Sequence, residues 1–192
     1  MTQLGNGLSS ADHHEDALSV QEALLSLHQR LGAPGENMLA LQSNLASTYS
    51  QLGDMEKAVR MRKDVYTGTL MVHGESGQQT LLEASNCATD LFDLRRFEEA
   101  KSLLRKNIPL ARRALGENDN TTLRMRRVYA RALFVDPAAT LDDVREAMTT
   151  FEEILRIARR VLGGTHPATK GIEEDLRRSR ARMETQPERA RN

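Results

Sequence analysis

The stretch "VLGGTHPATK" at residues 161–170 places a glycine after an apolar run and a short polar phrase after the glycine. A glycine in this position commonly ends a helix, because it takes the left-handed backbone conformation without steric cost. The polar residues and the proline that follow are typical of the first positions of a new helix. The stretch therefore predicts a junction between two helices.

The same junction recurs along the chain with a fixed period. The glycines that end the apolar runs stand 42, 42 and 47 residues apart: Gly32, Gly74, Gly116 and Gly163. A second landmark, an alanine after charged residues, recurs at spacings of 41, 42 and 47: Ala17, Ala58, Ala100 and Ala147. A period of roughly 20–50 residues is typical of stacked repeat proteins.

The apolar residues within each unit follow helical spacing. Leu41, Leu45 and Tyr49 fall four residues apart, which indicates an amphipathic helix. Each unit is therefore predicted to contain a first helix, a tight turn, a second helix and a loop. The turn at 134–143 is longer than the others, and its Thr140 and Asp143 can cap the helix that follows.

Composition narrows the classes of protein that fit. The 192 residues contain 27 basic and 27 acidic side chains, and this balance argues against general nucleic-acid binding. We expect no membrane span, because no run of about 18 apolar residues occurs, and no secretory signal at the N-terminus. The only cysteine, Cys87, excludes an internal disulfide and fits a reducing, cytoplasmic compartment.

A further pattern within the units resembles a known repeat family. A small residue is followed three residues later by tyrosine or leucine and twelve residues later by alanine, as in Ala46, Tyr49 and Ala58. This pattern is similar to that of tetratricopeptide repeats, whose ordinary length is about 34 residues. The 42-residue period and the phrase "LGGTHPAT" resemble the longer kinesin-light-chain type.

The resemblance implies an all-α fold, a right-handed superhelical α-solenoid of stacked antiparallel helix pairs. We expect one solenoid over residues 1–184 and a disordered tail at 185–192. Its parts are predicted as units 1–37, 38–79, 80–121 and 122–168, with a capping helix at 169–184.

The resemblance also implies a binding surface. In this family, peptides lie in a concave groove lined by the first helix of each pair. The positions that match the groove of the family are Ser43, Asn44, Ser47, Leu82, Ser85, Asn86, Thr89, Arg124, Arg127 and Arg131.

Two asparagines occupy the same place in successive units. Asn44 and Asn86 are 42 residues apart, where the family often uses asparagine to hold a ligand's backbone. A carboxamide both donates and accepts hydrogen bonds, so it can pair with an extended peptide without demanding a particular sequence. The alternative is that both asparagines simply face water.

Three arginines follow one another at i, i+3 and i+7 on one predicted helix. Arg124, Arg127 and Arg131 would form a stripe that attracts carboxylates or phosphates. The alternative is a solvated face, or pairing with carboxylates of the following helix. The candidates for that pairing are Glu173, Glu174 and Asp175.

These observations predict a non-catalytic scaffold that binds an extended, acidic peptide of a protein partner in the groove. The alternative is a structural or linker subunit of a larger assembly that docks through helix faces and array ends. We expect no enzyme activity, no cofactor and no metal site. Adjacent side chains such as His13 and His14 point apart on a helix, so they make a poor chelate.

Overall fold

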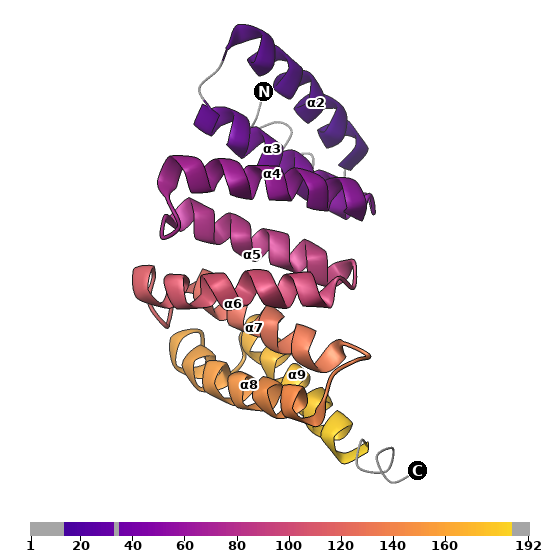
Figure 1. The fold of residues 1–192 in the computed structure, drawn as a ribbon, viewed down its shortest axis with the longest axis vertical. Helices are drawn as coiled ribbons and strands as arrows, with labels where there is room; N and C mark the ends of the chain where they lie inside the picture. Colours follow the sequence, from indigo (N-terminus) through magenta and orange to yellow (C-terminus); the bar gives the residue numbers. More distant parts are fainter. Residues whose placement is uncertain (1–13, 33–34, 186–192) are drawn as a thin grey trace. The chain divides into compact units, whose positions relative to one another are not determined.

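The computed structural model describes residues 14–32 and 35–185, which form eight helices and no strand. In Figure 1 these are α2 (His14–Leu31), α3 (Gly35–Gln51), α4 (Met55–His73), α5 (Gln78–Asp93), α6 (Phe97–Ala114), α7 (Asn120–Val135), α8 (Leu141–Val161) and α9 (Pro167–Thr185). The all-α fold is confirmed. The predictions for residues 1–13 and for 186–192 of the tail lie outside the described residues.

The repeat order of the helices follows the predicted period. The helices α3, α5, α7 and α9 begin at residues 35, 78, 120 and 167, which gives steps of 43, 42 and 47 residues. The first three begin two or three residues before the predicted unit boundaries, because polar residues precede the first apolar position of each. The predicted capping helix at 169–184 corresponds to α9.

The helices fall into two compact units. Unit 1 spans Met1–Leu94 and contains α2 to α5 among its described residues, while unit 2 spans Arg95–Asn192 and contains α6 to α9. Within each unit, every helix packs against the helix that follows it in the sequence. The prediction of one continuous, right-handed superhelical array through residue 184 stays a prediction.

The alanines that marked the period are buried. The second-helix alanines and the small residues of the first helices are all fully buried, at 0% exposure: Ala17, Ala58, Ala100, Ala147, Ala46, Ala88 and Ala130. A larger side chain at such a position would overpack the contact between helices. The residues that mark the repeat period therefore belong to the packed core.

The junction glycines have the backbone conformation that the sequence predicted. The φ angles of Gly32, Gly74, Gly116 and Gly163 are 62°, 73°, 95° and 88°, all in the left-handed region. At the long turn after α7, the side chain of Thr140 accepts from the Asp143 amide, and Asp143 accepts from the Thr140 amide. This capping box begins α8, as predicted.

Two further observations concern the described residues only. None of their helices is long and apolar enough to cross a membrane. Cys87 is a free, buried thiol, and burial raises its pKa to about 11. A thiol with such a pKa stays protonated at neutral pH and is a poor nucleophile.

Candidate peptide-binding surfaces

The predicted binding positions of unit 1 lie on α3 and α5, and most of them are reachable from solvent. Ser47 is exposed, and five others are half-buried: Ser43, Asn44, Leu82, Asn86 and Thr89. Ser85 is the exception, because its exposure is 0%. It packs between helices and offers no surface to a ligand, which corrects the prediction for this residue.

A buried arginine of α4 joins the two helices of this surface. Arg62 is only 3% exposed, and its Nε donates to Asp90 of α5 at 3.1 Å. Its Nη1 lies 3.4 Å from a carboxylate oxygen of Glu83, also on α5. On the α3 side, the guanidinium donates to Ser43 Oγ at 2.9 Å and to Ser47 Oγ at 3.0 Å.

Glu83 completes this cluster from the α5 side. Its carboxylate is 1% exposed and accepts from Ser43 Oγ at 2.8 Å and from Asn86 Nδ2 at 3.4 Å. Two carboxylates therefore meet one arginine, giving a formal charge of −1. Burial raises the pKa of Asp90, and the nearby Arg62 partly opposes that shift.

The cluster changes the interpretation of the predicted contact residues. Ser43, Ser47 and Asn86 are hydrogen-bonded within the protein. Ser43 links α3 to α5, Ser47 links α3 to Arg62 of α4, and Asn86 bonds Glu83 within α5. For the side chain of Asn44, the described part of the chain shows no hydrogen bond. The carboxamide of Asn44 is thus available to a ligand, while that of Asn86 already holds Glu83.

The sequence did contain a signal for this cluster, namely a charged residue at a position that is apolar in the next repeat. Arg62 occupies the helix position filled by Leu104 one repeat later and by Gln21 one repeat earlier, at spacings of 42 and 41 residues. All three are buried. Gln21 accepts a hydrogen bond from Thr48 at 2.8 Å, and Thr48 occupies the repeat position that Asp90 occupies in the next unit. A charged residue at a core position of the repeat predicts a buried partner, because an unpaired buried charge is costly.

In unit 2, the three predicted arginines lie half-buried on α7. The Nε of Arg127 donates to Asp175 of α9 at 2.7 Å, and the Nε of Arg131 lies 3.8 Å from the same carboxylate. Asp175 is 4% exposed. The arginine stripe of Arg124, Arg127 and Arg131 is therefore partly neutralised by one of the three carboxylates named as alternatives.

The other two carboxylates pair elsewhere. Glu173 accepts from Arg159 of α8, with Nη2 at 2.7 Å, and Glu174 accepts from Arg177 of its own helix. Arg127 and Arg131 therefore share one carboxylate, that of Asp175.

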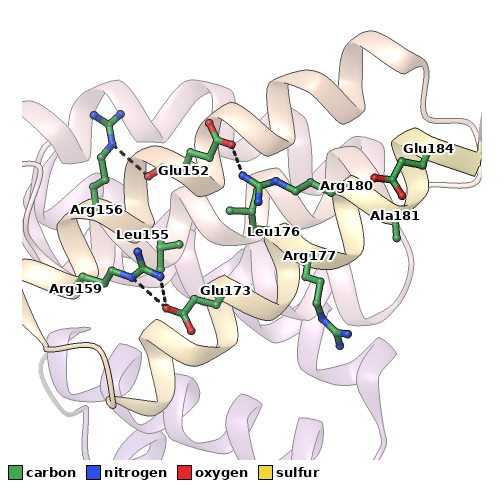
Figure 2. A pocket seen from close by; sticks show the side chains of 10 residues that line it. All are labelled: Glu152, Leu155, Arg156, Arg159, Glu173, Leu176, Arg177, Arg180, Ala181 and Glu184. Atoms are coloured by element: carbon green, nitrogen blue, oxygen red, sulfur yellow. Dashed lines mark hydrogen bonds and ion pairs between the residues drawn. The ribbon is translucent and has the colours of Figure 1, made fainter.

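A cleft of about 720 Å³ between α8 and α9 was not anticipated from the sequence. Figure 2 shows four arginines around it, Arg156 and Arg159 from α8 and Arg177 and Arg180 from α9. Each pair is spaced i, i+3, which places both members on one helix face. The i, i+3 spacing of these arginines is visible in the sequence, but it indicates a cleft only when the packing of α9 on α8 is known.

The described residues contain no group of three or more histidine, cysteine, aspartate or glutamate side chains arranged to hold a metal ion. His13 lies outside them. Cys87 lies buried in α5, and its burial raises the pKa of the thiol to about 11.

Comparison with known proteins agrees with the helical-repeat fold. Residues 84–120 and 40–61 match models of the tetratricopeptide repeat family. No curated protein sequence is similar enough to count as a relative.

Solved structures show the same fold at low sequence identity. Kinesin-light-chain TPR-like repeats from Podosopora anserina match with a TM-score of 0.79 and 19% identity, over 97% of this chain and 87% of that one. A variant of the same repeats gives a TM-score of 0.80 at 19% identity, over 97% and 86%. BtubC (BKLC) from P. vanneervenii matches with a TM-score of 0.71 and 18% identity, over 94% of this chain and 74% of that one.

Proposed function

We propose that this chain, a tetratricopeptide-repeat protein with the helical-repeat solenoid fold of the kinesin-light-chain type, is a non-catalytic scaffold that binds an extended peptide of a protein partner. The peptide would lie on the first helices of the repeats. The available carboxamide of Asn44, held beside the buried Arg62 cluster, is the observation that supports the proposal most directly.

The mechanism is preorganisation. Arg62 ties α3 to α5 through charged hydrogen bonds, so the surface loses little conformational entropy when a peptide binds. Asn44 would then donate to a peptide carbonyl and accept from a peptide N–H. Asn86 would exchange its 3.4 Å contact with Glu83 for one with the ligand.

Acidic peptides would be recognised by the arginine stripe of α7 itself. Its three side chains are half-buried, and guanidinium groups bind carboxylates in a bidentate manner. Unit 1 does not supply this preference, because its buried cluster has a formal charge of −1. The single cysteine of the chain, Cys87, is free, which fits a reducing, cytoplasmic location for the scaffold.

The test is selection of short, unstructured peptides on the purified protein, followed by affinity measurements with variants. Asn44→Ala combined with Asn86→Ala should weaken the selected peptides by roughly tenfold, because each lost hydrogen bond contributes about 0.5–1.5 kcal/mol. Gln29→Ala, which removes an exposed carboxamide from α2, is the matched control. Selected peptides that bind the double variant as tightly as the control would contradict the proposal.

The acidic preference needs variants that leave the buried aspartate paired. Arg127 should stay in place, because a carboxylate there would face Asp175. Arg124→Gln combined with Arg131→Gln should weaken acidic peptides and leave their amide analogues unchanged. Equal effects on both peptide sets would show that the arginines only support the fold.

A second candidate function is a structural subunit that docks through helix faces or array ends. The cleft between α8 and α9 favours it. In that case, assembly with the partner would survive both double variants above, while changes in the cleft would abolish it.

A further inference from the structure

The cleft between α8 and α9 has an apolar floor and a charged rim. Leu155, Leu176 and Ala181 line it together with the four arginines, Arg156, Arg159, Arg177 and Arg180. Three glutamates complete the lining: Glu152, Glu173 and Glu184. Its formal charge is +1, from four arginines less three glutamates. In Figure 2 the arginines lie on both helices along the cleft.

The repeat period shows which surface of α7 corresponds to this cleft on α9. Residues of α9 that line it lie 47 positions after residues of α7 that are buried, as Leu176 follows Tyr129 and Arg177 follows Ala130. In α7, this face is covered by α8: Tyr129 donates to Glu146 at 2.8 Å, and Arg126 pairs with Glu153. The cleft therefore corresponds, on α9, to the surface of α7 against which α8 packs.

Helix α8, which packs on that surface of α7, shows which side chains such a surface can bind. On α8, Val144, Ala147, Phe151 and Ile154 are fully buried at 0% exposure. Beside this apolar stripe stand Glu146 and Glu153, seven residues apart, and they contact the hydroxyl of Tyr129 and the guanidinium of Arg126. The surface of α7 thus binds an amphipathic helix that carries carboxylates beside its apolar stripe.

The rim of the cleft can receive carboxylates of a partner. The Nε of Arg156 donates a 3.4 Å hydrogen bond to the backbone carbonyl of Glu152, and the described residues show no ion pair for this arginine. Arg159 pairs with Glu173, and Arg180 pairs with Glu152, but all four side chains are 38–58% exposed. Exposed pairs of this kind contribute about 0–1 kcal/mol, so an incoming carboxylate can replace them.

We propose that this cleft binds an acidic amphipathic helix of a partner protein. The partner's apolar stripe would cover Leu155, Leu176 and Ala181, and its carboxylates would pair with Arg156 and Arg177 on the two sides. This is helix-in-groove recognition, with charge complementarity fixing the orientation of the helix. The inference rests on the scaffold function proposed above, but it uses none of the residues assigned to the extended peptide.

The probe is a synthetic peptide with the sequence of residues 141–155, "LDDVREAMTTFEEIL", stapled into a helix on its solvent face. It carries one basic and five acidic residues, for a net charge of −4, and the apolar stripe of α8. It lacks the arginines of the second half of α8. Binding to the full-length protein is measured by fluorescence anisotropy.

The variant Arg156→Glu, Arg177→Glu should weaken the probe by about tenfold or more, through two lost charge-assisted contacts. The matched control is Arg178→Glu, because Arg178 is exposed on α9 but does not line the cleft. We expect it to bind the probe as the unchanged protein does, and an amide analogue of the probe to bind weakly to all three. Circular dichroism verifies that the variants keep their helicity.

Three results would overturn the proposal. One is the absence of saturable probe binding, and another is equal binding by the cleft variant and Arg178→Glu, which would indicate exchange with α8 or an unspecific surface. The third is self-association of the protein that the cleft variant alone abolishes, because the cleft would then receive a second copy of this chain. Asn44→Ala with Asn86→Ala should leave probe binding unchanged, so the outcome is independent of the extended-peptide surface.

Discussion

Gly163 and Gly164 are neighbours in the loop between α8 and α9, yet their backbones differ. The φ angle of Gly163 is 88°, in the left-handed region, whereas Gly164 lies outside that region. A β-carbon at either position would meet no atom within 4 Å. The two positions therefore separate backbone strain from side-chain crowding.

We expect Gly163→Ala to lower the free energy of unfolding by about 1 kcal/mol. The β-carbon costs roughly 1–2 kcal/mol in the left-handed conformation, and the stiffer unfolded chain offsets part of that. Gly164→Ala is the matched control and should be neutral or stabilise by up to about 1 kcal/mol. Urea unfolding of both variants measures the difference. Equal midpoints would show that the junction does not depend on the left-handed glycine.

The hydrogen-bond partners of single residues could not be predicted from the sequence. Ser43 and Ser47 were predicted as ligand contacts, and the structure shows them bonded to Arg62. The repeat pattern gives the face of a helix on which a residue lies. It does not reveal a side chain from another helix that reaches the same place, because that depends on packing. Ser85, another predicted ligand contact, is fully buried.

At the scale of elements, α8 begins with a capping box that the sequence predicted. Thr140 Oγ1 accepts from the Asp143 amide at 3.1 Å, and Asp143 Oδ2 accepts from the Thr140 amide at 2.8 Å. The hydrogen bonds from the Thr140 side chain and backbone lower the pKa of Asp143 below its usual value of 3.8. The end of the helix is thus coupled to the ionisation of one carboxyl.

We expect Thr140→Ala to destabilise the protein by about 1 kcal/mol at neutral pH, as loss of a helix cap usually does. A carboxyl with a lowered folded-state pKa contributes stability above its unfolded-state pKa, here 3.8, and loses it as the pH falls through the folded-state value. The difference between the two proteins should therefore shrink as the pH falls below 3.8.

Urea unfolding across this pH range measures the effect. Thr149→Ala is the matched control, since Thr149 is an exposed residue of the same helix and its change should not depend on pH in this range. A Thr140→Ala effect that stays constant into acid would show that Asp143 contributes no charge-dependent part of the cap.

The junctions between helices followed from local chemistry. The long turn after α7 lies within the stretch 134–143, where the capping residues Thr140 and Asp143 placed it. The cleft between α8 and α9 could not be found in this way. It requires the angle at which one helix packs on the other, and no local pattern encodes that angle.

At the scale of the molecule, the repeats place the same small residue in the same environment again and again. Ala58 in unit 1 and Ala147 in unit 2 are both 0% exposed. Stacked repeats contact only their neighbours, so stability is close to a sum of local terms. The fold was predictable for this reason, because a period and a helical pattern describe every unit at once.

This locality leads to a prediction for hydrogen exchange. We expect Ala58→Leu and Ala147→Leu each to destabilise the protein by about 1–3 kcal/mol, because a larger side chain overpacks a tight helix contact. Ala58→Leu should accelerate amide exchange in α3, α4 and α5 while leaving α9 protected. Ala147→Leu should accelerate exchange in α7, α8 and α9 while leaving α2 and α3 unchanged, since openings of a repeat protein involve neighbouring helices first. Acceleration of all eight described helices by either variant would contradict additive repeats and would show that the chain opens as one cooperative unit.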